Sequence, residues 1–187
     1  MHMTLYSIVV FLHVVAMLGV FVALGTEWLL LSNIWFATDA AGARALIRAS
    51  ARLPVVGLSS CVFVLLTGIY LSTEAKAWSM PWIQVSLGAI VVMGFLGGIS
   101  GRRMRAMRKT AASECHASLD TYRRSAADAV LQIAIRVRFA TGLAIVLLMV
   151  LRCDMTASLS VMGAAFASGV LWGAPIRQCR FIERTTT

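Results

Sequence analysis

Long apolar runs separated by short polar connections dominate the pattern of this chain. Five runs stand out, at about residues 4–33, 53–72, 81–101, 129–151 and 155–174. An α-helix rises about 1.5 Å per residue, so roughly 20 apolar residues cross the hydrocarbon core of a bilayer. No run shows the apolar–polar alternation typical of a membrane-barrel strand. The pattern therefore predicts an all-α fold, a polytopic transmembrane helical bundle of about five spans in a single domain, 1–187.

Composition supports a membrane location. Hydrophobic residues make up 59% of the chain and charged residues 13%, with a mean hydropathy of +0.83. Such a chain has too little polar surface to coat a water-soluble globule. The first run exceeds the hydrophobic length of a signal peptide and no Lys or Arg precedes it, so we expect it to remain as a span. The cysteines show no C-x-x-C spacing, so we expect neither a zinc motif nor a disulfide framework.

Lys and Arg are distributed unevenly among the connections. Arginines cluster after the first run and again in a basic loop at 102–128, whereas the connections after the second and fourth runs are nearly neutral. Because cytoplasmic loops retain Lys and Arg, this alternation predicts the amino terminus outside and both the basic loop and the carboxyl terminus in the cytoplasm of a bacterial inner membrane. Membrane topology and anionic lipid account for the net charge of +9 without nucleic acid.

Local signals indicate where several helices begin. Pro54 and Pro81 lie at the starts of the second and third runs, where a missing backbone N–H is harmless. Ser118 is a candidate N-cap for a helical extension of the fourth span beyond the bilayer. Trp82 falls near the expected outer surface, and we expect it to anchor the third span there.

Two ionisable residues within the first run indicate where function could lie. On an ideal helix His13 and Glu27 share one stripe, which we expect to face the bundle, with about 20 Å of helix between them. Since an unpaired buried charge is costly, His13 should be neutral and either hydrogen-bonded or bound to a cofactor. Arg136 and Arg138 are candidate ion-pair partners of Glu27. Structural pairing, or a proton or quinol site, would explain such a pair.

A neutral imidazole in an apolar slot is the axial ligand that membrane bundles offer to b-type haem. This makes haem b the candidate cofactor and His13 the candidate iron ligand. Arg152 and Lys76, near the expected outer surface, are candidate partners for the haem propionates. The alternative is a core histidine bonded to a Ser, a Thr or a carbonyl group on a neighbouring helix.

The second axial ligand is open. His2 is terminal and His116 lies in the basic loop, so no other histidine lies within a run. Either His2 folds inward, a second chain supplies a histidine, the iron remains five-coordinate, or a methionine serves as the ligand. The candidate methionines are Met93, Met149 and Met155. Copper bound by Met17, His13 and Cys61 is a further alternative.

Small residues recur at helical spacing in two runs. The third holds Gly94, Gly97, Gly98 and Gly101, and the fifth holds Ser160, Ala164 and Ser168. Such repeats favour close packing of membrane helices, within the chain or in a homo-oligomer or membrane complex, over a porphyrin slot. The sequence contains no G-x-x-x-x-G-K-[ST], H-E-x-x-H or G-x-S-x-G motif that would indicate nucleotide hydrolysis, zinc proteolysis or serine hydrolysis.

Three stretches resemble a known group of small membrane proteins. The chain opens its first run with FLHVVAMLGVFVALG, ends its second with LLTGIYL and enters its third through AWSMPWIQVSLG. Over about residues 8–101 it resembles the superfamily of CopD-type copper-resistance proteins and HemJ-type protoporphyrinogen oxidases. The resemblance implies a helical bundle and a haem-binding role for His13. The chain departs from the HemJ-type pattern where that family has a functional lysine and a further histidine, and Gln84 and Ser86 stand in this region.

Two function classes follow from these observations. The first is a membrane protein that binds b-type haem through His13 for electron transfer or porphyrin redox chemistry, with a redox partner. The second is a non-enzymatic transporter, channel or membrane-complex subunit without a cofactor, in which His13 and Glu27 are structural or relay protons.

Overall fold

The computed structural model describes residues 2–113 and 118–173, which are helical throughout apart from short connections. Within these ranges lie α1 (His2–Phe36), α2 (Ala40–Ala49), the 3-10 helix η1 (Ser50–Arg52), α3 (Leu53–Glu74), α4 (Pro81–Ser113), α5 (Leu119–Ala126), α6 (Ala129–Leu151) and α7 (Met155–Gly173). The described residues contain no strand, so the all-α prediction is confirmed. Five helical stretches are long and apolar enough to cross a membrane: Leu5–Phe36, Ala40–Glu74, Pro81–Ala112, Ala129–Leu151 and Met155–Trp172.

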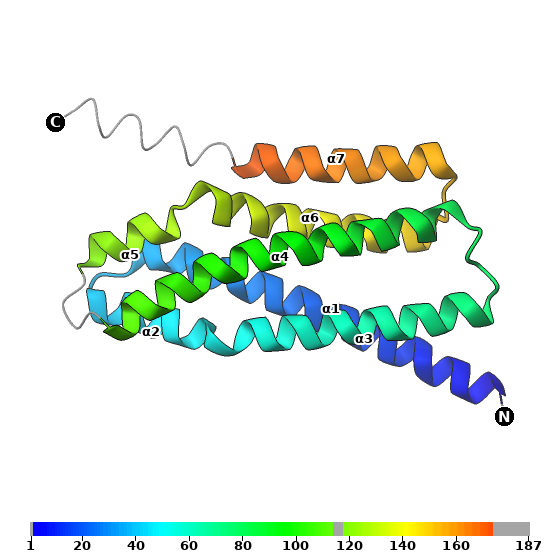
Figure 1. The fold of residues 1–187 in the computed structure, drawn as a ribbon, viewed down its shortest axis with the longest axis horizontal. Coiled ribbons are helices and arrows are strands. Elements are labelled where there is room, and N and C mark those ends of the chain that lie inside the picture. Colours follow the sequence, from blue (N-terminus) through cyan, green and yellow to red (C-terminus); the bar gives the residue numbers. More distant parts are fainter. Residues whose placement is uncertain (1, 114–117, 174–187) are drawn as a thin grey trace.

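The long helices lie side by side along one common direction (Figure 1). Helix α1 packs mainly against α3, and α6 packs against both α4 and α7. Contacts between α1 and α6 join these two halves. Although α3 and α4 follow one another in the chain, they make few contacts with each other. The bundle is therefore loosely packed between α3 and α4, a place that we call the split.

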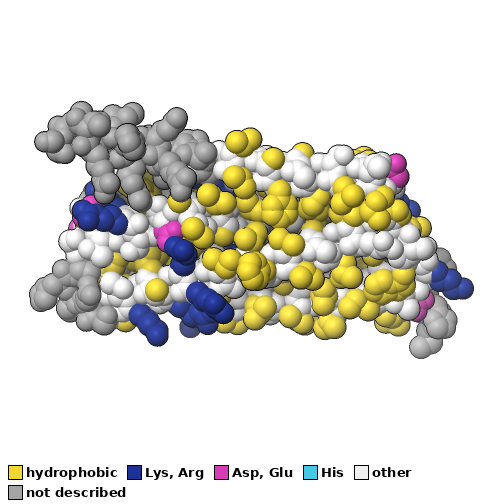
Figure 2. Space-filling view, turned by 45° about the horizontal axis from the view of Figure 1, so that its top comes forward, with side chains coloured by type: hydrophobic (Ala, Val, Ile, Leu, Met, Phe, Trp, Pro, Cys, Tyr) yellow, Lys and Arg dark blue, Asp and Glu magenta, His cyan; other side chains and the backbone are white. Residues whose placement is uncertain are grey.

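Much of the outer surface is apolar. In the face shown in Figure 2, hydrophobic side chains cover the middle of the molecule, and Lys and Arg gather toward its ends. Val55, Phe95 and Val150 are 70%, 71% and 74% exposed. Water would disfavour such a belt, whereas lipid tails accept it because they are equally apolar.

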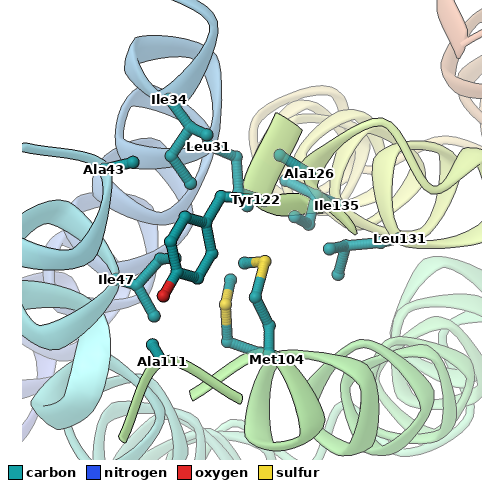
Figure 3. Packing of buried hydrophobic residues seen from close by; sticks show 11 residues of the cluster. Leu31, Ile34, Ala43, Ile47, Met104, Ala111, Tyr122, Ala126, Leu131 and Ile135 are labelled. Atoms are coloured by element: carbon teal, nitrogen blue, oxygen red, sulfur yellow. The ribbon is translucent and has the colours of Figure 1, made fainter. Parts of the chain in front are cut away.

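The short helices α2 and α5 close one end of the bundle, which we call the capped end (Figure 1). Asp39 starts α2, its Oδ1 accepting a hydrogen bond from the Gly42 N–H at 2.9 Å. Ile47 of α2 and Tyr122 of α5 are each 1% exposed and pack against Met104 of α4 and Leu31 of α1 (Figure 3). Residues from α1, α2, α4, α5 and α6 thus share one apolar core at this end.

The helix ends differ in part from the expectations. Pro54 lies in the first turn of α3 and Pro81 begins α4, as predicted. Helix α4 continues past residue 101 to Ser113, so much of the expected 102–128 loop is helical. Ser118 is an N-cap, as predicted, but of the separate helix α5. The predicted extension of the fourth span is wrong because Asp128 caps a new helix there, accepting from the Val130 N–H at 2.9 Å.

Close helix approach occurs at one glycine in particular. A Cβ on Gly169 of α7 would lie 2.7 Å from the Cα of Val137 in α6, closer than real contacts allow. By contrast, a Cβ on Gly94, Gly98 or Gly101 would meet nothing within 4 Å. The close packing expected at the glycine repeat is therefore not made at those three positions within the described chain.

We predict that Gly169→Ala destabilises the fold by about 2 kcal/mol, because the added methyl group must push α7 away from the Val137 backbone. Gly163→Ala is the matched control on the same helix, since a Cβ there meets nothing within 4 Å. Thermal unfolding in detergent measures both. Equal unfolding temperatures for the two variants would contradict the close approach of α6 and α7.

Candidate functional site

A cavity of about 380 Å³ lies between α1, α3, α4 and the end of α6, at the end of the bundle opposite the capped end. We call it the His13 cavity. Its volume is within the range of small-molecule sites, and its walls are mostly apolar. Val64, Ile90 and Met149 line it and also belong to the core in the middle of the bundle, or pack against that core. The split between α3 and α4 therefore holds a pocket that is closed off toward the bundle centre.

His13 lies in the wall of this cavity and is anchored by α3. Its Nδ1 is 2.8 Å from the hydroxyl oxygen of Thr67. The ring also lies over Gly68, where a Cβ would be in van der Waals contact with the His13 Cε1 at 3.4 Å. The expectation that a Ser, Thr or carbonyl group on a neighbouring helix would hold the ring is thus met by Thr67.

The Thr67 hydroxyl determines which nitrogen of His13 carries the proton. This hydroxyl donates its single hydrogen to the Phe63 carbonyl at 2.6 Å, with the Val64 carbonyl next nearest at 3.3 Å. Its oxygen can therefore only accept from His13, which places the ring proton on Nδ1. In the neutral ring Nε2 is then a free lone pair. The Val64 backbone is a second hydrogen-bond partner of the ring and lies beside Thr67, whose hydroxyl oxygen is 3.3 Å from the Val64 carbonyl.

Two further polar atoms of the cavity wall belong to α4. Ser86 is 5% exposed, and both its Oγ and the Nε1 of Trp82 are buried without a hydrogen-bond partner among the described residues. Trp82 and Ser86 are four residues apart, so they lie on one face of α4. Trp82 is half-buried and packs against the central core. Its role as an anchor of the third span at the membrane surface stays a prediction.

Of the two basic residues predicted to contact a cofactor, only Arg152 lines the cavity. Arg152 lines the cavity from the end of α6, where it adopts a left-handed conformation with φ 48° and ψ 46°. Lys76 is exposed in the α3–α4 connection and does not line the cavity, although Ala75 and Ala77 do. Arg152 is therefore the candidate counter-charge for a ligand carboxylate.

The candidate second iron ligands lie in different parts of the structure. Met149 lines the His13 cavity, whereas Met93 is buried in the central core and Met155 begins α7. His2 belongs to the same continuous helix as His13, about 16 Å away along its axis, so it does not fold back toward that ring. His116 lies outside the described residues. Among the candidates within this chain, the structure thus brings Met149 to the cavity of His13.

The proposed copper ligands are not brought together in the cavity. Met17 and Cys61 pack against the central core and do not line the cavity with His13. Within the described ranges, no three His, Cys, Asp or Glu side chains form a group that could hold a metal ion.

The predicted partners of Glu27 take different positions. Arg138 lies 3.4 Å from Glu27 through its Nη1, with 18% and 13% of the two side chains exposed. The same Nη1 donates to the Ser100 Oγ at 3.1 Å, and the Arg138 guanidinium passes over Gly97. This cluster links α1, α4 and α6, about 20 Å along α1 from His13.

Arg136 does not pair with Glu27 in the structure. It donates to the backbone carbonyl of Trp172, and its guanidinium carbon lies 5.7 Å from the centre of the Trp172 ring. Trp172 in turn packs edge-on against Trp28, with ring centres 5.6 Å apart. Arg136 thus stabilises the end of α7.

We predict that Arg138→Met destabilises the fold by about 3 to 5 kcal/mol, because it removes the hydrogen-bonded partner of the buried Glu27 carboxylate and leaves it only the charge of Arg108. The double variant Glu27→Gln with Arg138→Met should recover most of this loss, since the buried carboxylate is then gone. Arg102→Met is an exposed control on α4. Denaturant unfolding in detergent measures the four proteins. A double variant as unstable as Arg138→Met alone would contradict the pairing.

Sequence reasoning missed Thr67, Ser86 and Trp82 as parts of the site. Ser and Thr are ordinary in membrane helices and Trp is ordinary at membrane surfaces, so only the packing distinguishes them. No protein-family model, no curated protein and no solved structure matches this chain. The site is therefore interpreted from its own geometry.

Proposed function

We propose that this protein is an integral membrane protein that binds b-type haem in the His13 cavity, for electron transfer or porphyrin redox chemistry. One observation carries the proposal. Thr67 holds the Nδ1 of His13 at 2.8 Å in the wall of an apolar cavity, which makes the Nε2 lone pair the atom that the ring can offer to a metal. Residues that bind metal through imidazole commonly have the other ring nitrogen fixed in this way.

The described side chains suit a haem. The Nε2 of His13 would serve as an iron ligand, Met149 would offer a thioether in the same cavity, and Arg152 would offer a positive charge to a propionate. Bound haem would supply a one-electron couple, which an apolar cavity and the axial ligands tune. The resemblance to HemJ-type proteins adds the same role for a first-span histidine. Because the lysine and second histidine of that pattern are absent, electron transfer is favoured over the oxidase reaction.

We further propose that the five apolar helices cross a bacterial inner membrane, with the His13 cavity in the outer half and the capped end in the cytoplasm. Arginines concentrate at the capped end. Because cytoplasmic segments tend to retain Lys and Arg, this supports a cytoplasmic position for that end. Those in the described helices are Arg44, Arg48, Arg52, Arg102, Arg103, Arg105, Arg108, Arg123 and Arg124. The opposite end has Lys76 and Arg152, balanced by Glu74 and Asp154.

The absorption spectrum of the protein purified in detergent from haem-replete cells tests the cofactor. We predict a Soret band that is lost in His13→Ala. Met149→Leu should retain haem and move the spectrum toward a five-coordinate, high-spin form, because only the thioether ligand is removed. Met93→Leu is the matched control, since Met93 is buried outside the cavity.

A colourless, folded protein would overturn the haem proposal. It would leave a transporter, a channel or a membrane-complex subunit without a cofactor. A Soret band that persists in His13→Ala would show that haem binds elsewhere.

The orientation is tested by labelling single cysteines in a background without the native ones. In right-side-out membrane vesicles, an impermeant maleimide should label the Lys76→Cys variant at once. It should label the Arg124→Cys variant in α5 only after the membrane is permeabilised, because that residue lies at the capped end. Both parent side chains are exposed. The reverse labelling pattern would contradict the proposed topology.

A further inference from the structure

Two residues of α4 that line the His13 cavity each have a buried polar atom without a hydrogen-bond partner among the described residues. The Nε1 of Trp82 and the Oγ of Ser86 are both buried and have no partner among the described residues. A buried donor without a partner costs about 1 to 3 kcal/mol, so folded proteins rarely retain one without a reason. Both residues line the cavity.

Several Ser and Thr hydroxyls in the long helices donate to a backbone carbonyl three or four residues earlier, as serines in membrane helices commonly do. Examples are Ser59, Thr67, Thr73, Ser100, Ser160 and Ser168. Ser86 of α4 and Thr141 of α6 are buried hydroxyls without a partner among the described residues, and of these two Ser86 lines the His13 cavity. The Ser86 hydroxyl forms no such bond. Its hydrogen therefore has no acceptor among the described residues, in a residue that lines the cavity.

The chemistry of these atoms restricts what that partner is. The indole N–H of Trp82 can only donate, and the Ser86 hydroxyl also has a hydrogen to donate. The ligand must therefore present an acceptor to α4. Arg152 adds a positive charge to the same cavity, and no carboxylate of the described residues lines it. A carboxylate satisfies all three groups, because hydrogen bonds to an ionised acceptor are roughly twice as strong as neutral ones.

We propose that Trp82, Ser86 and Arg152 bind a carboxylate of the ligand held at His13, which on a porphyrin is a propionate. The inference rests on the proposed function and adds to it the orientation of the ligand. The propionate edge lies against α4 and the end of α6, not against Lys76. Trp82 and Ser86 thus select porphyrins with free carboxylates.

The test is a titration of the full chain, prepared from haem-depleted cells, with haem and with haem dimethyl ester. Trp82→Phe and Ser86→Ala should each weaken haem binding about tenfold, since each removes one hydrogen bond to a charged group. The same variants should weaken binding of the diester by less than about threefold. Trp35→Phe and Ser160→Ala are the matched controls, because both parent residues are exposed and lie outside the cavity.

Each failure has its own pattern. If the variants bind haem as tightly as the parent chain while binding still requires His13, the carboxylate site is overturned and the haem proposal stands. If they weaken haem and diester equally, the two residues act through packing, and the carboxylate site is again overturned. If the parent chain binds neither compound through His13, both proposals fail. Unfolding temperatures of the two variants, expected within about 5 °C of the parent, show that they fold.

Discussion

The hydrogen bond between His13 and Thr67 is the interaction on which the proposed ligand site depends. In an apolar bundle no water is at hand to satisfy an imidazole, so each ring nitrogen needs a protein or ligand partner. Thr67 supplies one partner and, because its own hydrogen goes to Phe63, fixes the proton on Nδ1. The lone pair at Nε2 is then the feature that distinguishes the cavity from an ordinary packing defect. It turns an apolar space into a candidate coordination site.

The two ends of the bundle differ in packing. At the capped end, α2 and α5 bring the Tyr122 core together, and the Glu27–Arg138 pair links α1 to α6 nearby. At the other end α3 and α4 separate and the cavity forms between them. A bundle held firmly at one end can leave its other end open, because stability and binding then rest on different residues. The close approach of α7 to α6 at Gly169 adds α7 to the tightly packed part of the bundle.

The sequence predicted the helices well because long apolar runs leave a chain few alternatives in a bilayer. It also placed Glu27 near two arginines, but it could not choose between them. Arg136 and Arg138 lie at similar depth and point to different sides of α6, so only packing decides that Arg138 meets Glu27. Lys76 illustrates the same limit. Its place at the end of a span suggested a cofactor partner, whereas the turn of the connection carries it away from the cavity.

The proposed ligand site requires that the proton of the neutral His13 ring lies on Nδ1. Nitrogen NMR of the ¹⁵N-histidine-labelled protein, without added haem, distinguishes a protonated Nδ1 from a protonated Nε2, and His13→Ala identifies the signals. We predict a neutral ring with the proton on Nδ1, and a change in that ring's signals in Thr67→Val. A proton on Nε2, or signals unaffected by the loss of the Thr67 hydroxyl, would contradict it.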